Sequence, residues 1–399
     1  MNVFQKIVKY VGFRDICDLL KILAAAIPGL VLRMFRKDIW LISERENDAH
    51  DNGYWFYKYV REKHPEINAY YSISFDCKDY VERIQPLGNA IRHGSFKHHI
   101  YMWACSKFIS AHLGDSYPAR LMSRFFVLYG IYPFKNIFLQ HGIIMNHAPF
   151  LEAENNRINL FITSTQPEHD FIVNGLGYPD NAVVIAGLCR YDCLYEFSAK
   201  PNQILIMPTW RLWFRPEYGH NFNELVDKWI HSDYYKYYTA LLTDPRLIAY
   251  AKEKKLDLVF FPHNEMQPFI ADFKKSCPDV RVVTNQEYDV QQALKDSSFL
   301  ITDYSSVLSD FAYMRKPALY FQFDYEAFRK HHYSEGYFSY KDDGYGPICR
   351  TVDEAVDYII QSCENHFQIE KIYLERIERT FLYHDMCNCE RNFALINNI

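Results

Sequence analysis

From about residue 38 to residue 365, short apolar runs alternate with segments whose apolar residues recur at helical spacing. The short runs predict strands, and the longer segments predict helices between them. The predicted strands are 39–43, 69–73, 107–111, 136–140, 160–164 and 182–187, then 204–207, 256–261, 280–283, 299–301 and 318–321. The predicted helices include 51–60, 95–106, 234–255, 290–295, 305–316, 352–365 and 369–385. Strands that alternate with helices indicate parallel sheets covered on both faces.

A polar stretch at 198–202 separates two such alternating sets. At 399 residues the chain is also too long for one ordinary hydrophobic core. We therefore expect two α/β domains, at 38–195 and 196–365, and a charged helical segment at 366–399 that packs back on the body.

Residues 1–37 have a different pattern. Apolar positions recur at helical spacing, at Phe4, Ile7, Val8, Val11, Ile16, Leu19, Leu20 and Leu23. Lysines and arginines lie between them, and the most apolar run, 22–32, is interrupted by Pro28-Gly29 and too short to cross a bilayer. The pattern predicts a basic amphipathic helix in the headgroup region of an anionic membrane. The alternative is a helix whose apolar face packs on the protein.

Polar residues follow four of the predicted strands. Ligands of parallel α/β sheets bind at the carboxyl ends of strands, so these residues are the candidate site. They are His141 and Gly142; Pro208, Thr209 and Arg211; Pro262 and His263; and Thr302, Ser305, Ser306 and Asp310.

The two serines stand where the helix after 299–301 is expected to begin. Unpaired backbone N–H groups and the helix dipole suit that position to a phosphate or diphosphate. Asp310, four residues beyond Ser306, lies on the same helix face and could accept a hydrogen bond from a sugar hydroxyl. The alternative is that both serines only cap the helix.

Composition limits the choice of function. A formal charge of −5 argues against general nucleic-acid binding, which needs a broad basic surface. Ten scattered cysteines without paired Cys-x-x-Cys units favour reduced thiols over a zinc site. No two aspartates are separated by a single residue, so the Asp-x-Asp metal clamp of many nucleotide-sugar transferases is missing. We expect no metal and no cofactor.

The sequence contains a series of short motifs in a fixed order: Asp51-Asn-Gly-Tyr54, Leu139-Gln-His-Gly142, Gly187-Leu-Cys-Arg-Tyr-Asp192, Pro208-Thr-Trp-Arg211, Pro262-His263, Thr302-Asp-Tyr-Ser-Ser-Val307 with Asp310, Lys316-Pro317, Gly336-Tyr-Phe338 and Gly346-Pro347. In this order and spacing, the motifs resemble those of the CDP-glycerol:poly(glycerophosphate) glycerophosphotransferase family of teichoic acid and capsule polymerases and primases. The resemblance covers essentially the whole chain after residue 37.

The resemblance implies an α/β fold of the GT-B class. Two Rossmann-like domains, an acceptor domain at 38–195 and a CDP-donor domain at 196–365, would face each other across a cleft, preceded by a membrane-associating helix. It also implies a metal-independent transferase that moves glycerol phosphate from CDP-glycerol to a hydroxyl of a lipid-linked or polysaccharide acceptor and releases CMP. Such an enzyme would act at the cytoplasmic face of the cell membrane as a peripheral protein of cell-wall biogenesis.

The resemblance also suggests roles for single residues. His141 is similar to the catalytic base, and the ordinary pKa of a histidine suits that role. His263 resembles the histidine that holds or protonates the departing phosphate. Arg190 and Arg211 are candidate phosphate clamps, since a guanidinium meets two oxygens at once. For Arg211 the alternative is a surface or interdomain ion pair. Pro208 and Thr209 would form a wall of the donor site, and Ser305 and Ser306 would bind the diphosphate.

The chain departs from the family pattern on the acceptor side. The usual Trp-His-Gly-Thr-Pro-Leu-Lys stands here as Leu139-Gln-His-Gly-Ile143-Ile-Met, without the Thr-Pro-Leu-Lys tail. The donor half is therefore better supported than the acceptor half, and the donor could carry ribitol instead of glycerol. Two alternatives remain, namely a GT-B glycosyltransferase that uses a CMP-activated acidic sugar, and a membrane-attached scaffold with an inactive cleft.

Overall fold

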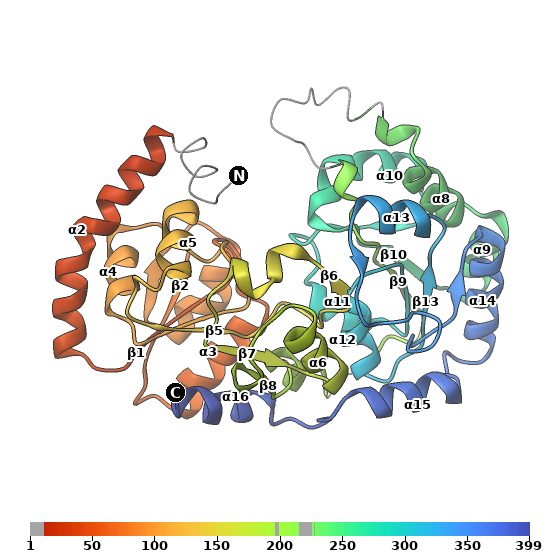
Figure 1. Ribbon diagram of the computed structural model, residues 1–399. Helices are drawn as coiled ribbons and strands as arrows, with labels where there is room; N and C mark the ends of the chain where they lie inside the picture. Colours follow the sequence, from red (N-terminus) through yellow and green to blue (C-terminus); the bar gives the residue numbers. More distant parts are fainter. Residues whose placement is uncertain (1–11, 196–198, 215–225, 227) are drawn as a thin grey trace. The chain divides into compact units, whose positions relative to one another are not determined.

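The computed structural model describes residues 12–195, 199–214, 226 and 228–399 (Figure 1). Within these residues the chain forms two compact units. The first contains the chain up to Ile143, Pro149–Asp192 and Asp385–Ile399. The second contains Ile144–Ala148 and Cys193–His384. The chain thus contributes a short segment, Ile144–Ala148, to the second unit, enters that unit again after Asp192 and returns to the first for its last helix.

The first unit is built on a parallel sheet of seven strands in the order β3-β2-β1-β4-β5-β7-β8. The strands are β1 (Ile39–Ser43), β2 (Asn68–Ile73), β3 (Ala90–Arg92), β4 (Lys107–Ser110), β5 (Lys135–Phe138), β7 (Leu160–Thr163) and β8 (Val183–Ile185). Its helices are α2 (Phe13–Phe35), α3 (Asn52–Lys63), α4 (Phe96–Ala104), α5 (Arg120–Leu128), α6 (Gln166–Asn174) and α16 (Asn388–Asn397).

Strand β1 explains why this sheet is buried on both faces. Trp40 and Ile42 pack with residues of α3 and α16, whereas Ile39 and Leu41 pack with residues of α2, α4 and α5. All five residues of β1 are buried. A strand with apolar residues on both faces cannot tolerate solvent on either, so helices cover both sides of the sheet.

Helix α2 continues through Pro28 to Phe35, which corrects the expectation that Pro28-Gly29 interrupts this segment. Two contacts hold it against the body on either side of the proline. The Trp103 indole donates to the Ile22 carbonyl at 2.9 Å, and the Arg33 guanidinium donates to the Cys105 carbonyl. Gly29 permits this close approach, because a Cβ there would lie 2.4 Å from the Cβ of Trp103.

The other face of α2 is exposed and apolar. We call it the α2 stripe; it consists of Phe13, Ile16, Leu20, Leu23, Ile27, Leu30, Val31 and Met34, with exposures from 42% to 84%. Phe4, Ile7, Val8 and Val11 of the predicted amphipathic segment lie outside the described residues. Within the described part of the chain, no helix combines the length and the apolar character needed to cross a bilayer.

The second unit has a parallel sheet of six strands in the order β11-β10-β9-β12-β13-β15. These are β9 (Gln203–Ile206), β10 (Asp257–Phe260), β11 (Arg281–Val282), β12 (Phe299–Thr302), β13 (Ala318–Phe321) and β15 (Ile348–Cys349). A separate antiparallel pair joins β6 (Asn146–His147) to β14 (Ser334–Glu335). The helices are α8 (Asp233–Leu242), α9 (Pro245–Lys254), α10 (Ile270–Ser276), α11 (Val290–Asp296), α12 (Val307–Tyr313), α13 (Tyr325–His331), α14 (Val352–Glu364) and α15 (Lys371–Thr380).

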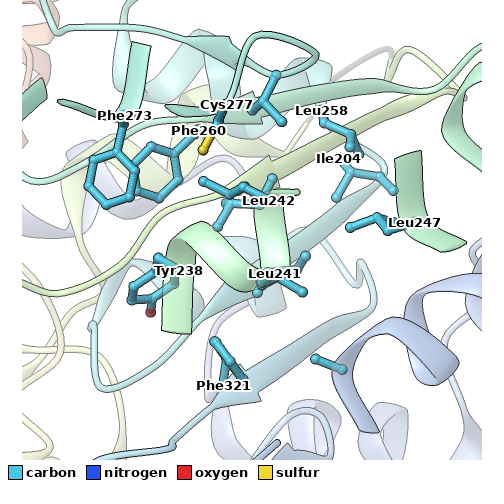
Figure 2. Packing of buried hydrophobic residues seen from close by; sticks show 14 of the residues in the cluster. Ile204, Tyr238, Leu241, Leu242, Leu247, Leu258, Phe260, Phe273, Cys277 and Phe321 are labelled. Carbon is cyan, nitrogen blue, oxygen red and sulfur yellow. The ribbon is translucent and has the colours of Figure 1, made fainter. Parts of the chain in front are cut away.

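Figure 2 shows the core of this unit, where Tyr238, Leu241 and Leu242 of α8 pack with buried residues of the sheet strands. Helices α8 and α9 replace the single helix predicted over 234–255. Pro245 occupies the first turn of α9, and the Asp244 carboxylate accepts the N–H groups of Arg246 and Leu247. A proline and a capping aspartate start a new helix instead of continuing the old one.

Other boundaries also differ from the sequence pattern. Strands β1 and β13 begin and end at the predicted residues, but β3, β6, β14 and β15 have only two or three residues each and were not predicted. Helix α12 has seven residues and starts at Val307, and Arg315 beyond its end adopts a left-handed backbone with φ 55°. The helix predicted at 369–385 ends at Thr380.

Asp192 attaches the last helix to the first unit. Its carboxylate accepts the backbone N–H groups of Asn388 and Cys389 at 2.9 and 2.8 Å, so it caps the start of α16. At the other end of the same motif, the Asn392 side chain donates to the Gly187 carbonyl at 2.9 Å. The stretch from Gly187 to Asp192 therefore holds α16 in place as well as carrying Arg190.

Gly187→Ala is expected to destabilise the protein by more than strain alone. Gly187 has φ +81°, and an added Cβ would lie 1.9 Å from the Asn388 side-chain oxygen. Gly177→Ala is the control, because Gly177 has a similar φ of +79° but its Cβ would meet nothing nearer than 4.0 Å. The control should lose about 1–2 kcal/mol of unfolding free energy from left-handed strain. Gly187→Ala should lose about 2 kcal/mol more, through the displaced Asn388. Equal losses in chemical denaturation would contradict this role for Gly187.

Candidate active site

In the first unit, three neighbouring strands place polar side chains at one edge of the sheet. Strands β1, β4 and β5 are adjacent, and the chain after them leads to Asp51, His112 and His141 respectively. The carboxyl ends of parallel strands share one edge, so residues distant in sequence meet there. Their side chains form a cluster of potential ligand atoms that all lie within 4.8 Å of one another.

Gln140 turns the chain so that His141 emerges from the sheet. Its backbone is left-handed with φ 64°, and its buried amide donates to the Ile162 carbonyl. Its own carbonyl accepts from the Asn52 side chain at 2.7 Å. The His141 side chain is then 59% exposed, whereas Gly142 behind it is buried. The predicted base is thus accessible on a rigid support.

Asp51 is the residue that organises this edge, and it was not among the site residues predicted from the sequence. It stands immediately before α3, and its side chain is 4% exposed. Its Oδ2 contacts Nδ1 of His141, and its Oδ1 accepts from the Arg190 guanidinium at 2.7 Å. Burial alone would raise the pKa of Asp51, but the neighbouring His141 and Arg190 hold it well below its ordinary range.

Arg190 belongs to the same network. The guanidinium that binds Asp51 also donates to the His141 carbonyl, and the Arg190 backbone N–H donates to the Asn52 side chain at 3.0 Å. Only 6% of Arg190 is exposed. The arginine that we expected to clamp phosphate therefore holds the Asp51 and His141 loops together.

Glu44 fixes the backbone around Asp51. Its carboxylate accepts the backbone N–H groups of His50, Asp51 and Tyr54, which brings a second acid to the start of α3. Gly53 leaves room for it, since a Cβ there would lie 2.9 Å from Cγ of Glu44. Burial and the neighbouring Asp51 raise the pKa of Glu44 to about 8. The Asp51-Asn-Gly-Tyr54 motif thus forms a closely packed helix start whose first residue, Asp51, contacts His141.

His112 is the third member of the cluster. Its Nδ1 lies 3.8 Å from Oδ2 of Asp51, and its ring centre lies 4.5 Å from that of His141. Burial lowers the pKa of His112 well below its ordinary value, which favours the neutral ring. Nothing in its local sequence singled it out.

In the second unit, Asp303 has the organising position. It is fully buried, and its carboxylate accepts the N–H groups of Thr209 and Tyr304 at 2.8 and 2.6 Å. The Tyr238 hydroxyl donates to it at 3.2 Å, and the Gln322 side chain donates to its carbonyl. Asp303 therefore joins the chain segments that follow β9, β12 and β13.

Arg211 is not placed to clamp a phosphate. Its side chain is fully buried, with Nη2 2.8 Å from Asp303 and Nε 2.7 Å from Asp324. Nη1 donates to the Thr209 carbonyl at 2.7 Å. All three guanidinium nitrogens therefore face protein acceptors. The structure has a buried ion pair within the second unit, which is neither the phosphate clamp nor the surface or interdomain ion pair expected from the sequence. Two buried carboxylates need a buried cation, which is why Arg211 lies inside.

The remaining residues predicted for the donor site divide into buried and accessible ones. Pro208, Thr209, Pro262, Thr302 and Asp310 are buried. The Thr302 hydroxyl donates to the Met207 carbonyl at 2.7 Å, so it fixes the end of β12. Ser305 and Ser306 are half-buried before α12, and the Ser305 hydroxyl accepts the Val307 N–H at 3.3 Å. The Ser306 side chain makes no capping hydrogen bond to the start of α12. Its hydroxyl can therefore bond to another group of this unit or to a ligand.

His263 is half-buried after β10. Its Nδ1 accepts the backbone N–H of Glu265 at 3.2 Å. The Trp210 ring stacks near it, with ring centres 6.1 Å apart, and also contacts His332 edge-on at 4.6 Å. The imidazole therefore has a fixed orientation, with Nδ1 engaged by the backbone.

Comparisons with known proteins place these features in context. A family model described as CDP-glycerol:poly(glycerophosphate) glycerophosphotransferase matches residues 29–398. Minor teichoic acid biosynthesis protein GgaB of Bacillus subtilis (strain 168) is 34% identical over 381 residues, which cover 94% of this chain and 41% of the relative. The chain thus spans less than half the length of that relative. A teichoic acid poly(glycerol phosphate) polymerase of the same organism is 37% identical over 73 residues, 18% of this chain and 10% of its own.

A solved structure of the wall teichoic acid polymerase TagF has a TM-score of 0.68 at 14% identity and covers 99% of this chain and 97% of its own. UDP-GlcNAc 2-epimerase from Neisseria meningitidis, bound to UDP-GlcNAc, has a TM-score of 0.51 at 12% identity. The match covers 90% of this chain and 100% of the epimerase chain. These likenesses concern the fold. Together with the two parallel sheets they confirm the predicted α/β class, GT-B with two Rossmann-like domains.

Arg211→Met should destabilise the protein far more than the loss of an exposed ion pair. Removing the buried cation leaves Asp303 and Asp324 unpaired, which is expected to cost about 3–5 kcal/mol of unfolding free energy. Arg246→Met is the matched control in the same unit, since Arg246 is exposed and pairs with Asp353 at 2.6 Å. It should leave the unfolding free energy nearly unchanged, because exposed ion pairs contribute little. If Arg211→Met kept wild-type stability and raised only the KM for the donor, the direct phosphate contact would be correct instead.

Proposed function

Since the chain belongs to the CDP-glycerol:poly(glycerophosphate) glycerophosphotransferase family, we propose that it transfers glycerol phosphate from CDP-glycerol to a hydroxyl of a lipid-linked or polysaccharide acceptor. The acceptor oxygen forms a bond to the β-phosphorus, the bond from that phosphorus to the bridging oxygen breaks, and CMP leaves. The product belongs to a teichoic acid, capsule or related cell-surface polymer. The observation that carries the proposal is the family match over 29–398, with the Asp51–His141 pair at the edge of the sheet.

The hydrogen-bond partner of His141 supports its role as the base. The Asp51 carboxylate accepts a hydrogen bond from Nδ1 of His141. The proton of the neutral imidazole therefore lies at Nδ1, and Nε2 has a free lone pair. Nε2 then takes the proton of the acceptor hydroxyl as the new bond to phosphorus forms. The Asp51 carboxylate stabilises the resulting imidazolium, and Arg190 keeps that carboxylate in place.

The partner of His263 supports the opposite role. Nδ1 of His263 accepts a backbone N–H, so the proton of its neutral ring lies at Nε2. That nitrogen can donate to a phosphate oxygen or to the departing CMP, but it cannot act as a base. The two histidines are thus distinguished by one carboxylate and one backbone N–H, with His141 as base and His263 as donor.

Ser305, Ser306 and the start of α12 provide hydrogen-bond donors for the donor diphosphate in this proposal. A solved structure described as TagF with a histidine-to-asparagine change was obtained after a soak with CDPG, which supports a cytidine-linked donor here. A teichoic acid poly(ribitol-phosphate) polymerase also matches, at 32% identity over 83 residues. CDP-ribitol is therefore the competing donor, and a CMP-activated acidic sugar is the alternative outside the family.

We further propose that catalysis needs no metal ion. The chain lacks an Asp-x-Asp clamp, and hydrogen bonds from His263 and from backbone N–H groups can stabilise the charge of the transferred phosphate. Incubation with CDP-glycerol, CDP-ribitol or CMP-sialic acid, with CMP release followed by mass spectrometry, separates the donors.

His141→Ala should abolish turnover while CDP-glycerol binding persists, because the base is removed and the donor-binding residues belong to the other unit. Asp51→Asn should lower kcat by about 10²–10⁴-fold, since the ring loses its orienting carboxylate. His169→Gln, a histidine change elsewhere in the first unit, is the control and should keep wild-type rates. CMP release measures turnover and calorimetry measures binding. A near-normal rate for His141→Ala would contradict the base assignment.

We propose that the protein associates peripherally with the cytoplasmic face of the membrane through α2. The α2 stripe supports this, since a row of large apolar side chains at helical spacing suits insertion between lipid headgroups. A pocket of about 380 Å³ in the same unit is lined by Arg33 of α2, Lys135 and Arg157, and by no aspartate or glutamate. Three cations without an acidic neighbour in the lining suit the phosphate of an anionic lipid.

Leu20→Glu combined with Ile27→Glu should abolish binding to vesicles that contain phosphatidylglycerol, because both residues lie in the α2 stripe, at 61% and 76% exposure. The matched control is Ile372→Glu with Leu382→Glu, at similar exposures of 50% and 61% in the second unit. Lys135→Gln and Arg157→Gln should each weaken binding by about 1 kcal/mol, an effect that salt removes. Cosedimentation measures all four. Equal loss in the control variant would show that charge alone disrupts binding and that α2 is not the contact.

A further inference from the structure

The buried imidazole of His112 has no role in the proposed reaction and an unusual environment. Only 7% of His112 is exposed, yet neither ring nitrogen has a hydrogen-bond partner among the described residues. Its backbone, in contrast, is fixed: the N–H donates to the Ser110 hydroxyl at 3.0 Å, and the carbonyl accepts from Ser110 and Ser116. A buried polar group left without a partner costs about 1–3 kcal/mol, so an unpaired imidazole beside the proposed base calls for an explanation.

We propose that Asp51, His112 and His141 form a binding site for a divalent transition metal ion of the Zn²⁺ class, and that the bound ion inhibits the transfer reaction. The site consists of two imidazoles and one carboxylate, delivered by the segments after three adjacent strands. Imidazole nitrogen favours Zn²⁺ and its neighbours over Mg²⁺ or Ca²⁺, which prefer oxygen ligands. The inhibition rests on the proposed function, whereas the metal site does not.

The geometry is close to what such an ion requires. The ligand atoms lie within 4.8 Å of one another. Tetrahedral ligands about 2.0 Å from zinc lie about 3.3 Å apart. His112 Nδ1 lies 3.8 Å from Asp51 Oδ2, whereas His141 Nδ1 is in direct contact with it, so side-chain rotations must draw the first pair together and part the second. Asp51 can bind through Oδ2, because Arg190 occupies Oδ1. That guanidinium then orients the carboxylate, as hydrogen-bonded neighbours of metal ligands commonly do, while its charge moderates the affinity.

Inhibition follows from the two nitrogens of His141. Asp51 keeps the proton at Nδ1 and leaves Nε2 free as the base. An ion that binds Nδ1 moves the single proton of the neutral ring to Nε2. No proton is gained or lost, but Nε2 can then only donate, and the acceptor hydroxyl keeps its proton. The ion thus converts the proposed base into a hydrogen-bond donor.

Titration of the metal-free chain with Zn²⁺, followed by calorimetry, tests the site without using activity, and the visible absorption of Co²⁺ reports the ligand geometry. We expect one ion per chain. His112→Gln should weaken binding by about 100-fold or more, since changes even to neighbours of metal ligands cost 10–100-fold. His112→Asn is a second variant if the first does not fold. The control His169→Gln should bind like the wild type. Unchanged Zn²⁺ binding in the His112 variants would overturn the site.

The inhibition is measured by CMP release in rising Zn²⁺, with each variant compared to its own metal-free rate. The wild type should lose activity and recover it on addition of a chelator, whereas the His112 variants should need at least tenfold more Zn²⁺. An enzyme that binds Zn²⁺ through His112 but keeps its rate would overturn the inhibition. A protein that binds Zn²⁺ but accepts none of the three cytidine-linked donors would contradict the proposed function and leave the metal site intact.

Discussion

A buried carboxylate at the edge of each parallel sheet is the interaction on which the rest of the site depends. Asp51 in the first unit and Asp303 in the second are 3% and 0% exposed. A buried charge is tolerated only where donors and a cation surround it. Each carboxylate therefore accepts backbone N–H and an arginine from another chain segment, Arg190 for Asp51 and Arg211 for Asp303. The electrostatic requirement of one side chain fixes several loops at once.

This requirement explains what the sequence could and could not predict. Strands such as 39–43 and 318–321 were found because apolar runs between turn residues report burial directly. The strand ends followed from them, and with them His141, His263 and the serines before α12. The partners of these residues could not be predicted in the same way, because Asp51 lies 90 positions from His141 and Arg211 lies 113 positions from Asp324. Local spacing carries no information about such contacts, so an arginine at a strand end was interpreted as a ligand clamp although it balances buried acids.

Some motifs also have a structural purpose besides the chemical one. The stretch from Gly187 to Asp192 carries Arg190 to Asp51, and it also caps and holds α16, which returns from the second unit. The left-handed Gly187 and the Asp192 carboxylate are both needed for that docking. A pattern that resembles a substrate-binding motif can thus owe part of its composition to attaching a helix nearly 200 residues away.

The two histidines show how the group that contacts Nδ1 decides whether Nε2 of the same ring accepts or donates a proton. A carboxylate at Nδ1 of His141 leaves Nε2 as an acceptor, and a backbone N–H at Nδ1 of His263 leaves Nε2 as a donor. Neither outcome depends on the residue type, which is identical, or on the strand end, which both share. It depends on whether a carboxylate oxygen, from Asp51, or a backbone N–H, from Glu265, contacts Nδ1. Because a divalent ion at Nδ1 would act on the ring as the backbone N–H does, the feature that makes His141 a base also makes it sensitive to metal.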